Sequence, residues 1–177
     1  MIISLLRQLL CMGMSLFLFV ACNQSRHIVD TSASIKDKAY ALEVKRQQVA
    51  RRLKIEKIQD TAKSLLGTSY KIGSLGPKSF DCSGFTNYVF KKIDCRLPRK
   101  ASDQASIGSP VAMDVVEAGD LLFFGHKNIH HVAMVSKVKR GVVYITHATT
   151  SRGVVEEKLK NSEYWSAKFK MARRIVS

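Results

Sequence analysis

The chain has 177 residues, which is enough for one domain with a substantial hydrophobic core and excludes an array of several large domains. Its 29 Lys and Arg residues outnumber its 14 Asp and Glu residues, so its formal charge at pH 7 is +15. This charge favours anionic partners.

The first residues have the pattern of an export signal. One basic residue, Arg7, precedes an apolar run from Leu9 to Ala21. Since this run is shorter than the ~20 residues that span a bilayer, we expect residues 1–21 to be a cleaved signal peptide and not a permanent anchor helix. An exported chain does not meet nucleic acid. Anionic lipid head groups and cell-wall polymers are therefore the partners that fit its charge.

A cysteine follows the apolar run directly. The sequence Phe19-Val20-Ala21-Cys22 resembles a bacterial lipobox, in which the cysteine is lipidated after cleavage. A lipid on Cys22 would hold the domain at a membrane surface, and we expect the outer membrane, on the side facing the periplasm. The alternative is an ordinary signal peptide followed by an incidental cysteine.

A polar and basic segment separates the signal from the folded domain. We expect residues 22–54 to form a lipidated tether with a basic part that is either an exposed helix or a helical part of the tether. A core-facing helical stripe follows, formed by Ile55, Ile58, Ala62 and Leu65. Gly67 is placed to end this helix, because glycine readily adopts the left-handed conformation after a helix. We therefore place the domain at residues 55–177 and expect a monomer.

The stretch SFDCSGFTNYVF predicts a helix that begins beside a cysteine. Asp81 is a good N-cap, and Phe85, Val89 and Ile93 recur every four residues, as one buried helix face requires. Cys82 then falls in the first turn, where free N–H groups and the helix dipole favour its thiolate. The alternative is a small buried cysteine that only packs well.

Two cysteines, Cys82 and Cys95, belong to the expected mature domain. The predicted helix rises ~1.5 Å per residue between them, which separates them by more than the ~7 Å that a disulfide can bridge. We expect both to be free thiols.

The chain after Ala118 contains three short β-branched and aromatic runs with turn residues between them: GDLLFFG, HHVAMVSKV and GVVYITHA. This pattern is typical of an antiparallel meander. Because the predicted helices come first and the strands follow, the sequence predicts an α+β domain.

The hairpin formed by the last two runs decides whether two histidines meet. A three-residue loop at residues 139–141 would pair Val138 with Val142 and would place His147 diagonal to His131 on the same face. A two-residue Arg-Gly turn would shift the register by one residue and send His131 to the opposite face. We expect the first register.

The order of Cys82, His131 and His147 is that of the nucleophile, base and orienting residue in papain-like enzymes. The chain also resembles the NlpC-type cysteine peptidases of bacterial cell walls, especially the small lipoprotein murein endopeptidases. The stretches that carry this resemblance are LLGTSYKIG, FDCSGF, LPRKASDQ, AGDLLFF, HHVAMV, THATTSRGVV and YWSAKFKMARRI.

The resemblance covers residues 55–177 and implies a papain-like domain. Its N-terminal helices would pack on an antiparallel sheet of about five to six strands. The implied activity is hydrolysis of an amide bond in the stem peptides or cross-links of peptidoglycan, without metal or cofactor. Cys82 would be the nucleophile, His131 the general base and His147 the residue that orients the base.

Further residues are assigned by the same resemblance. Tyr70 would support an oxyanion site together with the backbone N–H of Cys82. Asp81 and Ser83 would shape a pocket that recognises an amine of the stem peptide. Arg99 and Gln104 fall in a stretch that lines the cleft rim, although we expect structural roles for both. One departure affects a pocket wall, because residues 72–74 read Ile-Gly-Ser where the family usually has Trp-Gly-Gly.

Two other functions use the same residues. The cysteine and histidines could form a zinc site with an open position, although the short paired spacing of typical zinc sites is missing from the sequence. Alternatively, the domain could bind peptidoglycan without cleaving it.

Overall fold

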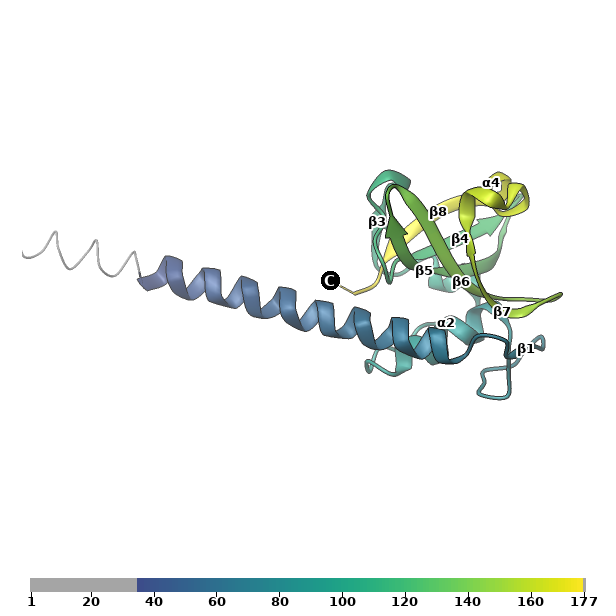
Figure 1. The fold of residues 1–177 in the computed structure, drawn as a ribbon, viewed down its shortest axis with the longest axis horizontal. Helices are drawn as coiled ribbons and strands as arrows, with labels where there is room; N and C mark the ends of the chain where they lie inside the picture. Colours follow the sequence, from purple (N-terminus) through teal and green to yellow (C-terminus); the bar gives the residue numbers. More distant parts are fainter. Residues whose placement is uncertain (1–34, 177) are drawn as a thin grey trace, which may run out of the picture. The chain divides into compact units, whose positions relative to one another are not determined.

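A computed structural model describes residues 35–176 of the chain (Figure 1). The chain divides into two compact units, Met1–Val49 and Ala50–Ser177. The predicted signal peptide, Cys22 and the tether up to residue 34 lie outside the described residues. Within residues 35–176, no helix is both long enough and apolar enough to cross a membrane.

The described part of the first unit, residues 35–49, is helical. Its apolar side chains are largely in solvent, with Ile35 61% and Leu42 69% exposed. The segment is rich in Lys, Arg, Gln, Glu and Ala, which are good helix formers without burial. The helix that both alternatives expect in the basic segment is present in these residues.

In the second unit, residues 50–64 form a helix that packs one face on the core. Ile58 and Ala62 on this face are buried, and Ile55 and Leu65 pack beside them. Gly67 follows with a φ of +83°, and its N–H donates to the carbonyl oxygen of Val154 at 2.9 Å. The predicted apolar stripe and the glycine stop are confirmed.

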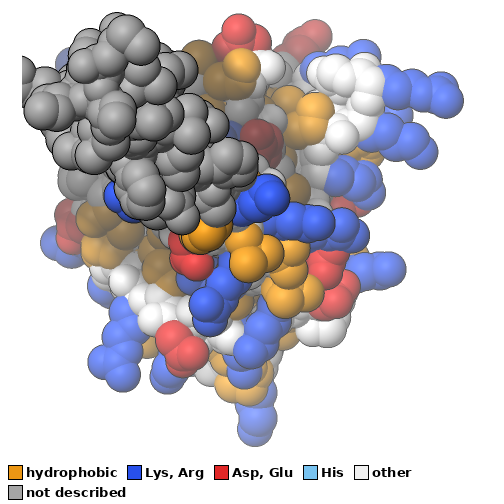
Figure 2. All heavy atoms as spheres, turned by 90° about the vertical axis from the view of Figure 1, so that its left-hand side faces the viewer, with side chains coloured by type: hydrophobic (Ala, Val, Ile, Leu, Met, Phe, Trp, Pro, Cys, Tyr) orange, Lys and Arg blue, Asp and Glu red, His pale blue; other side chains and the backbone are white. Residues whose placement is uncertain are grey.

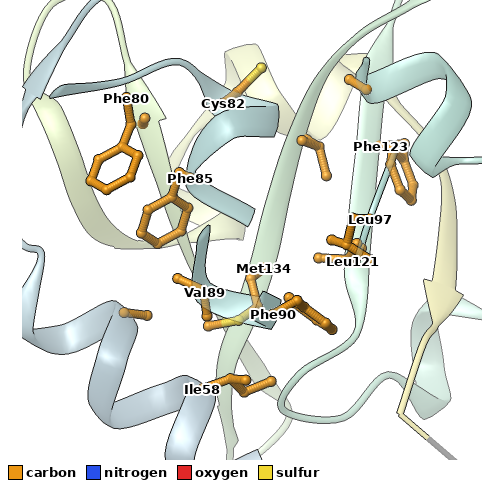
Figure 3. Packing of buried hydrophobic residues seen from close by; sticks show 14 of the residues in the cluster. Ile58, Phe80, Cys82, Phe85, Val89, Phe90, Leu97, Leu121, Phe123 and Met134 are labelled. Carbon is orange, nitrogen blue, oxygen red and sulfur yellow. The ribbon is translucent and has the colours of Figure 1, made fainter. Parts of the chain in front are cut away.

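The helix α2 spans Cys82–Lys91 and carries the main apolar contacts of the domain (Figure 3). Asp81 caps it, since the Asp81 carboxylate accepts from the N–H of Gly84 at 2.7 Å. Phe85 and Val89 are fully buried. The helix ends before Ile93, which nevertheless packs against the same apolar cluster.

The main sheet has six strands in the order β3-β8-β4-β5-β6-β7, and every neighbouring pair is antiparallel. The strands are β3 Ser109–Val111, β4 Leu121–Gly125, β5 Ile129–Lys139, β6 Val142–Thr149, β7 Gly153–Lys158 and β8 Phe169–Arg174. The pair β1 (Ser69–Tyr70) and β2 (Ser79–Phe80) forms a separate parallel sheet. Short helices complete the chain: α3 Ala101–Gln104, η1 Met113–Val115, η2 Leu159–Asn161 and α4 Glu163–Lys168.

The main sheet is covered on both faces. Leu121 and Phe123 of β4 join the cluster under α2, whereas Leu122 and Phe124 join a second cluster on the other face. This double burial explains why β4 reads as a continuous apolar run and not as an alternating strand. The predicted α+β class and the helices packed on an antiparallel sheet are confirmed.

The β5–β6 hairpin corrects one prediction. The turn has two residues, Arg140 and Gly141, with φ values of 51° and 74°, so Lys139 pairs with Val142. Such a turn with two positive φ values matches the natural twist of the strands. The register then shifts at Ser136, so that residues 134 and 135 pair with residues 146 and 145. The extra residue of this bulge cancels the one-residue slip of the turn.

The surface carries the excess of positive charge. Figure 2 shows many Lys and Arg side chains on one face, next to scattered acidic and apolar side chains. Some basic residues of the domain are paired, as in the Arg51–Glu117 and Lys137–Glu156 ion pairs.

Candidate active site

A cavity of about 420 Å³ lies beside the start of α2. Its lining includes Tyr70, Cys82, His131, Arg152 and Trp165. Cys82 is 8% exposed, and its Sγ lies 3.9 Å from the backbone oxygen of His130. In Figure 3 the sulfur points away from Phe85 and Val89 below it. Cys82 therefore lies at the border of the apolar cluster, where it also lines the cavity. Cys82 and Cys95 are both free thiols, as predicted.

His131 and His147 meet on one face of the main sheet. The Nε2 atom of His131 lies 2.9 Å from the Nδ1 atom of His147, which is a hydrogen bond between two buried rings. This contact exists because the bulge at Ser136 restores the register that the two-residue turn would have lost. The structure thus brings the three predicted catalytic residues together, with Cys82 and His131 lining the same cavity.

Two residues at this site were missed by the sequence analysis. Trp165 of α4 stacks on the His131 ring, with centroids 4.1 Å apart and planes at 20°. Glu157 of β7 places its Oε1 2.8 Å from the Nε2 of His147. Since β7 pairs with β6 so that Val155 faces His147, strand alternation puts Glu157 diagonal to that histidine. Recognising GVVEEK as a strand would have found this contact.

Asp81 and Ser83 occupy a polar cluster next to the cavity and do not line it. The Asp81 carboxylate accepts from the N–H groups of Gly84 and Gly73 and pairs through both oxygens with the Arg99 guanidinium. Ser83 donates to Asp81 and accepts from Arg99 at 3.0 Å. Burial raises the pKa of Asp81, but the Arg99 guanidinium and the two N–H groups outweigh burial and lower this pKa overall. The carboxylate is thus ionised and already paired.

Gln104 is fully buried and held by the fold. Its Nε2 donates to the backbone oxygens of Ser83 and Pro98, and its Oε1 accepts from Thr86. These bonds fix the first turn of α2 against the loop before α3.

Residues 72–74, where the sequence departs from the usual Trp-Gly-Gly of the family that it resembles, keep their backbone contacts. Ile72 is 82% exposed, Gly73 has a φ of +79°, and the Ser74 hydroxyl donates to the Ser79 carbonyl oxygen at 2.7 Å. A large side chain at position 72 is therefore not needed to hold Asp81.

Tyr70 lines the cavity on the side of the small β1–β2 sheet. Burial raises the pKa of its hydroxyl, and the nearby Cys82 and Asp81 raise it further. The hydroxyl is thus protonated near neutral pH and can donate a hydrogen bond into the cavity. Its role at an oxyanion remains a prediction.

The sequence predicts that Cys82 rests as a thiolate, whereas its burial favours the neutral thiol. Burial raises the pKa of the Cys82 thiol above its ordinary 9.0, and the N–H groups of Val132, Ser83 and Cys82 oppose this rise only in part. Burial also lowers the pKa of His131 well below 6.5, and His147 lowers it further. Since a low dielectric disfavours both charged forms, the resting site holds a neutral thiol and a neutral imidazole.

The zinc alternative gains no support from this geometry. In the described part of the chain, no group of three or more His, Cys, Asp or Glu side chains is arranged to hold a metal ion. The Nε2 of His131 and both ring nitrogens of His147 are engaged in hydrogen bonds within the protein.

Comparison with known proteins agrees with the fold. The sequence pattern of the NlpC/P60 family matches residues 67–174, which include every residue of the cavity lining named above. The chain belongs to the NlpC/P60 family. A probable endopeptidase of Haemophilus influenzae is 33% identical over 165 residues, covering 91% of this chain and 92% of that protein.

Other NlpC/P60 relatives are longer. The gamma-DL-glutamyl hydrolase of Bacillus subtilis is 40% identical over 124 residues, which cover 69% of this chain but only 30% of that protein. The solved structure of the peptidoglycan hydrolase RipB from Mycobacterium tuberculosis superposes with a TM-score of 0.61 at 25% identity, covering 73% of this chain and 68% of that one. The predicted family and the NlpC/P60 type of fold are confirmed.

Proposed function

We propose that the protein is a cysteine endopeptidase that hydrolyses an amide bond in the peptide part of peptidoglycan. The observation that carries the proposal is the shared cavity of Cys82 and His131, with the far nitrogen of His131 held by His147 at 2.9 Å. Membership of the NlpC/P60 family and the activities for which its relatives are named, a peptidoglycan hydrolase among them, support the choice of substrate.

The first step starts from neutral groups. Because the Nε2 of His131 is bound to His147, its Nδ1 is the nitrogen left to accept the thiol proton. As this proton moves to His131, the sulfur of Cys82 attacks the substrate carbonyl and forms a tetrahedral intermediate. In this proposal the backbone N–H groups at the start of α2 and the Tyr70 hydroxyl donate to the oxyanion, and each such donor typically lowers the barrier by about 3–4 kcal/mol.

The second step releases the amine. The protonated His131 gives its proton to the leaving nitrogen, the C–N bond breaks and a thioester remains on Cys82. Neutral His131 then takes a proton from water as the water oxygen attacks the thioester carbonyl. The C–S bond breaks, the carboxylic acid product leaves, and His131 returns the proton to the sulfur. His147 keeps the ring of His131 in place through both half-reactions.

Thiol alkylation and metal chelation separate this proposal from its rivals. Release of soluble muropeptides from purified sacculi should stop after the protein has been treated with iodoacetamide above pH 9, where the Cys82 thiol reacts, and should continue in EDTA. Loss of release in EDTA would point to the zinc site, and binding to sacculi without any release would point to an inactive binding module. Mass spectrometry of the released fragments identifies the bond that is cut.

We also propose that the protein acts in the bacterial cell envelope as a lipid-anchored monomer, with the lipid on Cys22 and the outer membrane as its site. The signal-like run before Cys22 supports this proposal. The positive charge of the chain suits both an anionic lipid surface and anionic wall polymers.

A further inference from the structure

Hydrogen bonds extend from the base into β7 beyond the three predicted residues. The Nε2 of His147 lies 2.8 Å from Oε1 of Glu157, and the Nη2 of Arg152 lies 2.8 Å from Oε2 of the same carboxylate. The contacts therefore run from His131 through His147 to Glu157 and end at Arg152.

The charge of Glu157 determines which ring nitrogens carry protons. Burial raises the pKa of Glu157, but Arg152 and His147 outweigh burial and lower this pKa, so the carboxylate is ionised and can only accept hydrogen bonds. The Nε2 of His147 must then donate. Burial also lowers the pKa of His147 and keeps the ring neutral, so that its Nδ1 has no proton and accepts.

The tautomer of His147 determines the tautomer of His131. Since the Nδ1 of His147 accepts, the Nε2 of His131 must donate across the 2.9 Å contact. A neutral imidazole carries only one N–H, so the Nδ1 of His131 is left with a free lone pair. This is the atom required to take the proton of Cys82. With the opposite tautomer of His147, the Nδ1 of His131 would already hold a proton and could not act as a base.

We propose that Glu157 is a positioning residue that fixes the tautomers of both His147 and His131, so that the Nδ1 of His131 is unprotonated in the resting site. This inference rests on the proposed function for the role of His131 as base. The tautomers are a property of the free protein, so this part of the inference does not depend on the proposed function. Arg152 assists by holding the carboxylate ionised and in place through its own hydrogen bond.

The neighbouring glutamate provides a matched control. Glu156 lies on the same strand, but its side chain pairs with Lys137, away from the histidines. Glu156→Gln removes one negative charge from β7, as Glu157→Gln does, while leaving the contacts of His147 intact. Exposed ion pairs such as Lys137–Glu156 contribute little to stability, so this variant should fold normally.

The test combines imidazole ¹⁵N NMR of the whole protein with steady-state kinetics on a peptidoglycan fragment. In the wild type and in Glu156→Gln, the spectra should show both histidines protonated at Nε2. In Glu157→Leu, which removes the acceptor, His147 and His131 should populate the other tautomer. In Glu157→Leu we expect kcat to fall about tenfold or more with little change in KM. Residues that orient a functional side chain without touching the substrate typically contribute factors of that order.

Glu157→Gln keeps an oxygen that can accept from His147, so it should retain more activity than Glu157→Leu. If Glu157→Leu does not fold, Glu157→Gln provides the test instead, because the histidine tautomer populations in Glu157→Gln should still differ from those of the wild type. Unchanged Nε2 protonation in both Glu157 variants would overturn the proposal. A kcat of Glu157→Leu equal to that of the wild type would also overturn it. If the wild type itself shows no hydrolysis, the proposed function fails while the spectra still decide the tautomers.

Discussion

The imidazole of His131 lies almost flat against the indole of Trp165, with ring centroids 4.1 Å apart and planes at 20°. Trp165 also contacts His147 edge-on at 5.2 Å and Phe124 at 5.4 Å. One side chain from the short helix α4 thus fixes the position of the proposed base and covers the hydrogen bond between the two histidines.

Replacing Trp165 should therefore lower both the catalytic rate and the stability of the fold. In Trp165→Leu the ring of His131 loses its stacking partner, and we expect kcat to fall at least tenfold. The free energy of unfolding should drop by about 1–2 kcal/mol, since an aromatic pair contributes about 1 kcal/mol beyond area burial. Kinetics and urea unfolding measure the two effects. Trp165→Phe keeps a flat face and should retain most activity; equal losses in both variants would contradict a stacking role.

The pH dependence of Cys82 alkylation and of kcat/KM should show that Cys82 and His131 are both neutral in the resting site. Because burial raises the pKa of Cys82 above 9.0, alkylation of Cys82 by iodoacetamide should be slow at pH 7 and accelerate only above pH 9. Because the pKa of His131 is lowered, the base stays unprotonated in mild acid, and the acid limb of kcat/KM should lie below pH 6.5. Peptide mapping separates Cys82 from Cys95. Fast alkylation of Cys82 at pH 6–7 would instead indicate a thiolate–imidazolium pair.

The glycine of the FDCSGF stretch is required by close packing of the backbone. A Cβ on Gly84 would lie 2.0 Å from the carbonyl oxygen of Ser74, which is held in place by a hydrogen bond from the N–H of Asp81. We expect Gly84→Ala to cost about 3 kcal/mol of unfolding free energy, since the backbone cannot yield cheaply. Gly141→Ala is the control, because that Cβ meets nothing within 4 Å and only its φ of +74° is unfavourable.

At Gly141, the strain of a left-handed alanine should cost about 1–2 kcal/mol. Chemical denaturation of both variants gives the comparison. A loss at Gly84 no larger than that at Gly141 would show that the Ser74 loop moves freely and does not hold the start of α2.

The membrane anchor can be tested in cells. Cys22→Ser removes the only proposed site of lipidation, so the protein should lose incorporation of labelled palmitate and move from the membrane fraction to the soluble fraction. The domain itself should keep its activity on sacculi, since residue 22 precedes the family match at residues 67–174. Continued labelling of Cys22→Ser would disprove this site.

Local patterns in the sequence predicted the elements that present the site. Asp81 is a cap by its own chemistry, the spacing of Phe85 and Val89 is that of a helix face, and the runs around His131 and His147 are typical of strands. Each of these signals lies within a few residues of the chain, so no tertiary information is needed to interpret it.

The remaining features depend on distant contacts. The bulge at Ser136 compensates for the turn at residues 140–141, and only the packing of both sheet faces selects that register. Trp165 and Glu157 reach the histidines from α4 and β7, short elements with little periodicity. The resting charge of Cys82 follows from its burial, which the helix position alone does not reveal.

Replacing Cys82 tests the proposed nucleophile directly, and Cys95, the other free thiol among residues 35–176, provides the control. Cys95 packs beside the core cluster and does not line the cavity. Purified Cys82→Ala, Cys95→Ala and wild-type protein should be incubated with sacculi, and the released muropeptides quantified by mass spectrometry. We expect no release by Cys82→Ala and near wild-type release by Cys95→Ala. Undiminished release by a folded Cys82→Ala protein would contradict it.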